Sequence, residues 1–459
     1  MNLRTPDDAT LRAWDLAHLW HPFTPQAAWA ESTPLIIERG EGVYLEDSEG
    51  RRYLDGVSSL WCNVHGHRHS KLDAALRDQI DQIAHTTMLG LTHPTAIRLA
   101  RELVERAPAG LNRVFYSDDG ATAVEVALKM AYQYWRQKPD PEPARTLFLS
   151  LTDAYHGDTL GDVSVGGVDR FHAMFGDILF PSLRAPSPNC YRCPLGQARE
   201  TCGLACLSEM DKVLREHRGQ VAAVVIEPTV QCAAGMIVQP DGYLKGVERL
   251  CREHDTLLIA DEVAVGFGRT GTLFACEQES VRPDFLCLAK GITGGYLPLA
   301  ATLTTDRISS AFYGTPADGK TFYHGHTYGG NPLGAAVALA NLSVFDEERT
   351  LETLVPKMDH LAARLVDLAQ LVHVGDVRRK GFIAGIELVK DRATRERYAF
   401  SDQVGARVCR LARESGVLIR PLGDVLVVML PLAAEIEHID LLIDALIDCV
   451  RRITEENSR

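Results

Sequence analysis

The chain has 459 residues, of which 46% are hydrophobic and 24% charged, and a net charge of −13. Its length predicts two domains with a large buried core, and its acidic balance, with no basic run, argues against a nucleic-acid partner. The first ten residues contain no apolar signal region and no apolar run reaches membrane-spanning length, so we expect a cytoplasmic protein with no membrane partner.

The N-terminal part, residues 1–75, is predicted to be an arm followed by strands. Residues 35–55 alternate in pattern and contain turn residues, which indicates antiparallel strands, and residues 69–85 have helical spacing. The arm itself contains three tryptophans, Trp14, Trp20 and Trp29. We expect this part to join a smaller C-terminal domain in space.

Residues 76–340 are predicted to form a large domain. From about residue 90, helices alternate with short apolar strands, namely RVFYS, TLFLSL, VAAVVIEP, TLLIADE, DFLCLAKG and LAATLTT. This alternation is typical of an α/β fold with a mostly parallel sheet. Residues 341–459 are predicted to form a smaller α+β domain, with helices around the strands GFIAGIELV and VLIRPLGDVLVVMLP.

Two polar residues, Asp261 and Lys290, each follow a buried strand and precede a glycine-rich turn. They lie in LLIADEVAVGFGRTG (257–271) and DFLCLAKGITGG (284–295). Chemistry gathers at the carboxyl ends of strands in open α/β sheets. A carboxylate and an amine there suit pyridoxal phosphate, because the lysine forms the Schiff base and the aspartate keeps the ring nitrogen protonated. A structural ion pair at the strand ends explains the spacing equally well.

A candidate phosphate site lies where a strand ends and a helix begins, at Ser117–Thr122. A helix N-terminus offers unpaired backbone N–H groups and the positive end of a dipole, and Gly120 allows close backbone approach. Gly120 and Ala121 are therefore candidates for holding a phosphate. An ordinary helix cap, which Asp and Thr also provide, is the alternative.

The sequence around these residues resembles the class III pyridoxal-phosphate aminotransferases. The stretch from Leu258 through DEVAVGFGRTG to Asp284 and AKGITGG carries the family signature. Within the family it most resembles the branch that makes 7,8-diaminononanoate in biotin biosynthesis, through WHPFT (20–24), VSSLWCNVHGH (57–67), YSDDGATAVEVALKMAYQYW (116–135), YHGDT (155–159) and HGHTYGGNPLG (324–334). The resemblance runs from about Leu19 to about Pro431.

This resemblance implies the type I pyridoxal-phosphate fold and the conversion of 8-amino-7-oxononanoate to 7,8-diaminononanoate. Lys290, Asp261 and Tyr155 would be the catalytic residues, with the Tyr155 ring stacked on the cofactor. A plain core tyrosine is the alternative for Tyr155. Glu227 would lie near the cofactor, although a strand-end cap explains it nearly as well.

The same resemblance implies an obligate homodimer with shared active sites. His326 and Thr327 would reach the phosphate from the partner subunit. Arg420 would bind the carboxylate of the substrate through two parallel hydrogen bonds, with a structural ion pair as the alternative. The other residues expected to contact substrate are Trp61, Tyr155, Gly325, Phe23 and Leu60.

The amino donor stays open between S-adenosylmethionine and lysine. The sequence departs from the usual pattern of the branch at Phe23, Leu60 and Val427, where tyrosine, tryptophan and tyrosine are usual. Each change removes a ring or a hydroxyl that could contact a sulfonium or an adenine, and such losses affect binding. These departures favour the variant enzymes that take the amino group from lysine.

Four of the eleven cysteines lie close together in sequence, in NCYRCPLGQARETCGLACL. Cys190, Cys193, Cys202 and Cys206 could bind structural zinc or an iron–sulfur cluster. A cysteine-rich surface loop without a ligand is the alternative, because the spacing departs from the commoner paired CxxC pattern. We expect no metal in catalysis.

Three other functions share these features. A class III aminotransferase acting on another ω-amino acid would keep Lys290 and Asp261 and differ in WHPFT, VHGH and Arg420. A pyridoxal-phosphate enzyme of another reaction type, such as a mutase or decarboxylase, is the second. A non-catalytic binding protein that keeps the fold is the third.

Overall fold

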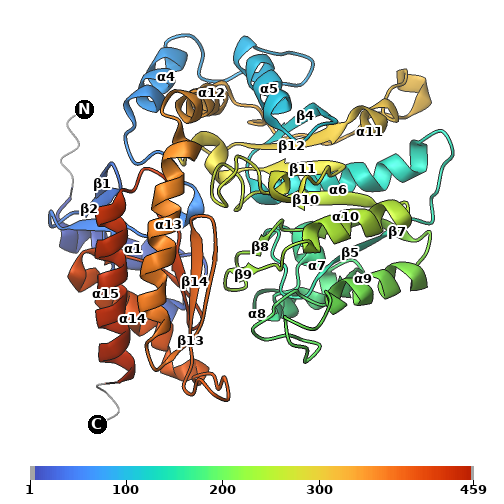
Figure 1. Cartoon of the computed structure of the whole chain (residues 1–459). Coiled ribbons are helices and arrows are strands. Elements are labelled where there is room, and N and C mark those ends of the chain that lie inside the picture. Colours follow the sequence, from blue (N-terminus) through green and yellow to red (C-terminus); the bar gives the residue numbers. More distant parts are fainter. Residues whose placement is uncertain (1–5, 456–459) are drawn as a thin grey trace.

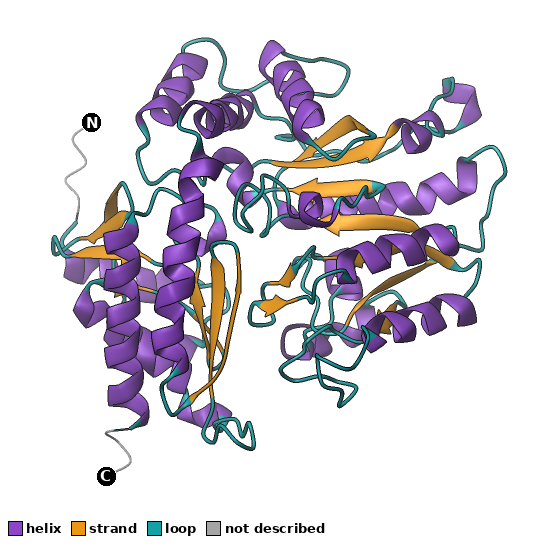
Figure 2. Cartoon of the chain, in the orientation of Figure 1, coloured by secondary structure: helices purple, strands orange, loops and turns teal. Residues whose placement is uncertain are grey.

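The computed structural model describes residues 6–455. A large part built around one sheet lies beside a smaller part in which the beginning and the end of the chain meet (Figures 1 and 2). No helix in the described range is both long and apolar enough to cross a membrane.

The large part is organised around a seven-stranded sheet of order β4-β12-β11-β10-β7-β5-β6. Only β12 runs antiparallel to its neighbours, so the predicted α/β fold with a mostly parallel sheet is confirmed. The strands are β4 (Leu111–Ser117), β5 (Leu147–Leu151), β6 (Leu183–Ala185), β7 (Val221–Ile226), β10 (Leu257–Asp261), β11 (Phe285–Leu288) and β12 (Ala300–Thr305).

Both faces of this sheet are covered by helices. Successive side chains of a strand point to opposite faces, so each strand packs against helices on both sides. In β10, Leu257 and Ile259 pack in the cluster that contains α6 (Gly120–Gln137), whereas Leu258 and Ala260 pack in the cluster that contains α10 (Tyr243–Glu253). Burial on both faces explains why these strands are continuous apolar runs in the sequence.

The small part contains two four-stranded sheets. The first, of order β1-β2-β3-β15, joins β1 (Ile37–Glu41), β2 (Tyr44–Asp47) and β3 (Arg52–Asp55) to β15 (Val417–Leu418). The second is antiparallel, of order β13-β14-β17-β16, with β13 (Val374–Lys380), β14 (Ile383–Leu388), β16 (Pro421–Leu422) and β17 (Val425–Val428). Helix α15 (Ile436–Thr454) packs against α13 (Thr350–Ala369) and α14 (Val404–Ala412).

The remaining helices include α12 (Pro332–Glu347), a buried helix that contacts α4 (Ser70–Ile80) and α5 (Pro94–Arg106). The domain boundary predicted at residue 340 falls inside α12, and the division of the chain stays a prediction. The others are α1 (Asp8–His18), α2 (Gln26–Ala30), α3 (Ser58–Trp61), α4 (Ser70–Ile80), α5 (Pro94–Arg106), α7 (Leu160–Val165), α8 (Asp169–His172), α9 (Ala205–Glu216) and α11 (Asp306–Ser310).

Several strands were not predicted. Strand β13 has the sequence VGDVRRK and only its first residue is buried, so it lacks an apolar run. The two-residue strands β8 (Val230–Gln231) and β9 (Ile237–Val238) form a short hairpin that is too brief to give a pattern. The antiparallel strands predicted over residues 35–55 are confirmed as β1, β2 and β3.

Candidate active site

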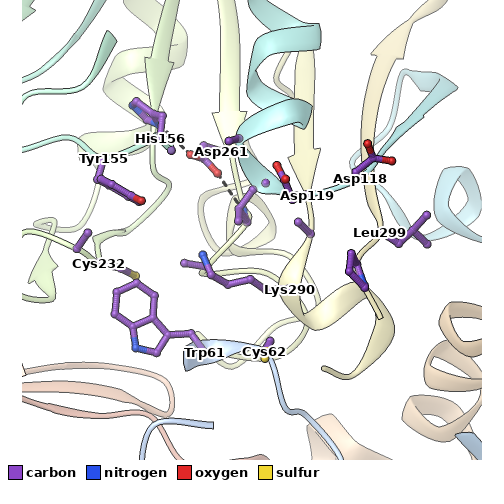
Figure 3. Close-up of a pocket in the computed structure, with 18 of the residues that line it drawn as sticks. Trp61, Cys62, Asp118, Asp119, Tyr155, His156, Cys232, Asp261, Lys290 and Leu299 are labelled. Atoms are coloured by element: carbon purple, nitrogen blue, oxygen red, sulfur yellow. Dashed lines mark hydrogen bonds and ion pairs between the residues drawn. The ribbon is translucent and has the colours of Figure 1, made fainter. Parts of the chain in front are cut away.

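One cavity of about 730 Å³ lies at the carboxyl ends of the central strands. Asp261 ends β10 and Lys290 follows β11, and these strands are parallel neighbours with Asp261 paired to Cys287. Figure 3 shows Asp261, Lys290, Tyr155 and Trp61 arranged around this cavity. The fold therefore brings together the two residues that the sequence singled out.

Asp261 is buried and fixed by two hydrogen bonds. Its Oδ2 lies 2.8 Å from Nδ1 of His156, and its Oδ1 accepts from the backbone N–H of Val263 at 3.0 Å. His156 is also buried, and its Nε2 has no partner among the described residues. The carboxylate is thus held in one orientation at the end of its strand.

The cavity carries an excess of acidic side chains. Lys290 is the only lysine or arginine on the described lining, against five carboxylates: Asp118, Asp119, Asp158, Glu227 and Asp261. The Nζ of Lys290 lies 5.4 Å from the centre of the Trp61 indole ring, close enough for a cation–π contact. A ligand with positive charge near Asp261 would complement this lining.

Glu227 is a buried carboxyl whose acidity is strongly altered. Burial, and secondarily the charge of Asp261, raise the pKa of Glu227 to about 8. Its carboxyl accepts hydrogen bonds from the backbone N–H groups of Cys232 at 2.9 Å and Tyr155 at 3.3 Å. The side chain is therefore largely neutral at neutral pH in the protein alone.

The N-terminus of α6 opens onto the cavity. Asp119 caps the helix by accepting from the Thr122 N–H at 2.9 Å, while neither Gly120 nor Ala121 has an acceptor for its N–H among the described residues. A Cβ added at Gly120 would lie 2.5 Å from Cγ1 of Val263, so only glycine fits. The two N–H groups and the helix dipole are suited to binding an anion.

Trp61 is presented by a left-handed turn, α3, in which four consecutive residues have positive φ: Ser58 (52°), Ser59 (48°), Leu60 (71°) and Trp61 (70°). Left-handed backbone costs about 1–2 kcal/mol for each L-residue, so the turn must be held from outside. Ser58 donates to the Met429 carbonyl at 2.6 Å, and the buried Arg269 donates to Ser58 Oγ at 3.1 Å.

Tyr155 lies on the cavity with its hydroxyl donated to Asp158 Oδ2 at 2.8 Å. Its ring lies edge-on to the Phe171 ring and almost parallel to the His172 ring, with distances of 6.1 Å and 6.0 Å between the ring centres. The ring centres of Phe23 and Phe171 are 5.4 Å apart, so the N-terminal arm reaches Tyr155 through the Phe171 ring. Burial raises the pKa of Tyr155 far above its usual value.

Other predicted site residues do not line the cavity within one chain. Gly325, His326 and Thr327 lie on an exposed loop, where His326 Nδ1 is 2.8 Å from Oδ2 of Asp118, a lining residue. The predicted contribution of this loop to a partner subunit stays a prediction.

The remaining substrate candidates also lie off the described lining. Arg420 is half-buried, and its guanidinium has no hydrogen-bond or ion-pair partner in the range 6–455. Phe23 is 54% exposed and Leu60 45% exposed. Val427, in β17, is buried in the apolar cluster that contains Trp61.

Some lining residues had no role in the sequence interpretation. His156 was named only as part of YHGDT, and nothing in the sequence pairs it with Asp261, 105 residues away. Cys232 comes from the short β8–β9 hairpin, and residues 295–299 follow the Lys290 turn. Residues 295–299 could have been predicted from the sequence, since GGYLP continues the glycine-rich turn after Lys290.

The four clustered cysteines are half-buried free thiols. In residues 6–455, no group of three or more His, Cys, Asp or Glu side chains is arranged to hold a metal ion. The geometry therefore gives no support to the zinc or iron–sulfur alternative for Cys190, Cys193, Cys202 and Cys206.

Comparison with known proteins identifies the family. The model of the aminotransferase class-III family matches residues 26–450. The chain belongs to the class III aminotransferases. It is 54% identical, over 98% of this chain and 99% of the relative, to adenosylmethionine-8-amino-7-oxononanoate aminotransferase of Geobacter sulfurreducens, and 52% identical, over the same shares, to the enzyme of that name from Aquifex aeolicus.

Solved structures of this family have the same fold. The enzyme of that name from Methanocaldococcus jannaschii gives a TM-score of 0.93 at 45% identity, covering 97% of this chain and 100% of that chain. An amine transaminase from an uncultivated Pseudomonas species, with pyridoxal phosphate bound, gives a TM-score of 0.91 at 37% identity. The match covers 95% of this chain and 99% of that chain. This class III aminotransferase is thus a pyridoxal-phosphate-dependent enzyme.

The residues on the cavity fit this cofactor. The close approach at Gly120 leaves backbone N–H groups for a phosphate. Asp261 offers a buried carboxylate for the ring nitrogen, and Lys290 offers an amine for the aldehyde carbon. Trp61 and Tyr155 add aromatic surface to the same cavity.

Proposed function

We propose that this aminotransferase converts 8-amino-7-oxononanoate to 7,8-diaminononanoate in biotin biosynthesis. The similarity to enzymes named for this substrate, at 52–55% identity over 98% of the chain, carries the proposal. The meeting of Lys290, Asp261 and the α6 N-terminus in one cavity supplies the machinery that such a reaction needs.

In this proposal each residue has a distinct task. Bound pyridoxal phosphate withdraws electrons from the carbon that carries the amino group. Asp261, oriented by His156, maintains negative charge at the ring nitrogen, and Gly120 and Ala121 donate N–H groups to the phosphate. Lys290 accepts and returns a proton at Nζ as general base and general acid.

We propose that Arg420 binds the carboxylate of 8-amino-7-oxononanoate. Its guanidinium is half-buried and has no protein partner in the described range. A planar guanidinium matches a carboxylate with two parallel hydrogen bonds, and a buried charge without a partner is costly. Trp61, Phe23, Leu60 and Gly325 complete the proposed substrate contacts.

S-adenosylmethionine is the first candidate for the amino donor, because the curated relatives are named for it. Lysine is the second candidate, and Phe23, Leu60 and Val427 favour it. Val427 packs in the Trp61 cluster without a hydroxyl, so a tyrosine there would change both the volume and the polarity beside that indole.

We propose a cytoplasmic homodimer in which His326 and Thr327 act at the phosphate of the partner's site. The exposed position of their loop beside Asp118 supports this arrangement. Exposed apolar residues of the N-terminal arm, among them Trp14, Leu19 and Trp20, offer surface for a second copy to cover.

The test follows the two half-reactions in purified holoenzyme. A donor added alone is expected to remove the absorbance of bound pyridoxal phosphate, and 8-amino-7-oxononanoate added next is expected to restore it. Restoration after S-adenosylmethionine, or after lysine, identifies the donor. Failure of 8-amino-7-oxononanoate to restore the absorbance with either donor would overturn the proposed substrate.

A second candidate function is transamination of other ω-amines. A solved (S)-enantioselective omega-transaminase from Thermomicrobium roseum has a TM-score of 0.93 at 35% identity, covering 99% of this chain and 100% of that chain. Restoration of the absorbance by simple aldehydes or ketones, but not by 8-amino-7-oxononanoate, would favour this function.

A further inference from the structure

A second cavity, of about 430 Å³, lies outside the active site between β13 and the loop that carries Cys190. Its volume is within the range of small-molecule sites. It is lined by residues 376–380 of β13, by β9 with Gln239 and Asp241, and by four residues of the cysteine loop: Asn189, Cys190, Tyr191 and Arg199.

This cavity is cationic in a protein of net charge −13. Its described lining carries four cationic side chains and two anionic ones, which leaves a surplus of positive charge: Arg199, Arg378, Arg379 and Lys380 against Asp241 and Asp376. A local surplus of this sign concentrates anions in a concave site.

The surplus is not neutralised by nearby protein groups. Arg378 is balanced, since its Nη1 lies 2.7 Å from Asp376 and 2.8 Å from Glu387. By contrast, Arg379 donates only to the carbonyl of Gly381, and the Arg199 side chain has no hydrogen-bond or ion-pair partner in the described part of the chain.

Lys380 is a further group on the lining that favours an anion. Lys380 has its nearest carboxylate, on Asp241, at 3.9 Å, and the Asp241 side chain is 92% exposed. Tyr191 also lines the cavity, but its hydroxyl is buried and lies against Gly375, so the anion would be held by the cationic groups.

The second cavity shares a wall with the active site. Cys232 and Ala233 of the β8–β9 hairpin line the active-site cavity, whereas Ile237 and Val238 of the same hairpin line the second one. Arg378 holds the tip of the hairpin through the carbonyl of Gly235. A ligand in the second cavity would thus lie against a segment that also shapes the catalytic one.

We propose that this cavity binds a small molecule that carries a phosphate group, held by Arg199, Arg379 and Lys380. Guanidinium groups match the geometry of phosphate oxygens with paired hydrogen bonds, whereas an amine supplies a point charge. The site is separate from the phosphate position at the α6 N-terminus.

The test is calorimetric titration of inorganic phosphate, pyrophosphate and adenosine monophosphate into holoenzyme, in which the α6 position is already filled. We expect one equivalent bound per chain. Arg199→Gln and Arg379→Gln are each expected to weaken binding at least about tenfold, as the loss of a charge-assisted hydrogen bond implies. Arg101→Gln, at an exposed arginine of α5, is the matched control and should bind as wild type does.

The three probes separate the sources of the phosphate group. Tighter binding of adenosine monophosphate than of phosphate indicates a nucleotide, and equal binding indicates the phosphate group alone. Absence of saturable heat with all three probes, or equal affinities in the two arginine variants and wild type, would overturn the proposal. Arg199 is exposed, so its variant is expected to fold, and cofactor content and unfolding temperature check this.

Discussion

At the scale of single residues, two buried carboxyl groups beside the cavity differ in their hydrogen-bond partners. Asp261 has both oxygens engaged, by His156 and by a backbone N–H. Glu227 also accepts two backbone hydrogen bonds, but its pKa is still raised to about 8 by burial and by Asp261. Asp261 is thus held in one orientation, and the Glu227 carboxyl beside it is largely protonated at neutral pH.

The first prediction concerns the pH dependence of stability in cofactor-free protein. The pKa of Glu227 rises from 4.5 to about 8 on folding, so its contribution to stability is present at low pH and is lost as pH rises between these values. Glu227→Gln removes this loss. The unfolding temperature of the variant should therefore gain on wild type from about pH 5 to about pH 8. A difference that stays constant across this range would contradict the assigned pKa.

The second prediction concerns Gly120, where a Cβ would lie 2.5 Å from Cγ1 of Val263. Gly120→Ala should weaken binding of pyridoxal phosphate at least about tenfold, because the start of α6 must move from its position. Adding Val263→Ala should recover most of the affinity, since the two sites are directly coupled. Cofactor titration by absorbance measures both; an equal loss with and without the second change would show that the contact is not the cause.

Lys290 and Asp261 could be predicted from the sequence because each ends a continuous apolar strand, a pattern that fixes its position in the sheet. Asp261 and His156 are 105 residues apart, and a histidine that follows a strand can serve many purposes. Their contact depends on strand order, since β5 is separated from β10 by β7. The sequence pattern alone does not contain that order.

At the scale of elements, the left-handed turn α3 is the most strained segment beside the site. Arg269 and the Met429 carbonyl hold it through Ser58, so side chains from distant segments compensate an unfavourable backbone. The sequence VSSLW contains no glycine and gives no sign of this conformation. By contrast, a helix such as α6 could be predicted, because its helical periodicity and its N-terminal capping residue both indicate the same start.

The third prediction tests this strain at Leu60, which has φ of 71° and an exposed side chain. Leu60→Gly should raise the free energy of unfolding by about 1 kcal/mol, because glycine adopts positive φ without a Cβ clash. Chemical denaturation measures the change. Leu441→Gly, at an exposed position of the right-handed helix α15, is the matched control and should lower stability by about 1 kcal/mol. A loss of similar size in both variants would refute the strain.

At the scale of the whole molecule, the site is built from segments far apart in sequence. The large sheet supplies Asp261 and Lys290, and the small part holds the Trp61 turn in place. Apolar residues of the N-terminal arm are exposed, and so is the loop at 325–327, which contacts Asp118 at the edge of the cavity. A second copy is the expected cover, and its symmetry would place one loop at each site.

The fourth prediction tests the shared site by subunit mixing. Lys290→Ala and Thr327→Ala homodimers should each be inactive. Unfolded and refolded together in equal amounts, they should regain roughly a quarter of wild-type activity, because each mixed dimer contains one intact site. Lys290→Ala mixed with Asp261→Ala is the control and should stay inactive, since both residues come from the same chain. No recovery in the first mixture would contradict a site completed by the partner.

The pairing of β3 with β15 has a consequence for how the protein is made. The Leu54 N–H donates to the Gly416 carbonyl, and Ser58 reaches Met429, 371 residues further along the chain. During translation the first strands therefore cannot pair with β15 until almost the whole chain has left the ribosome. The large sheet can form meanwhile, so the growing chain carries unpaired strand edges until its C-terminal part is made.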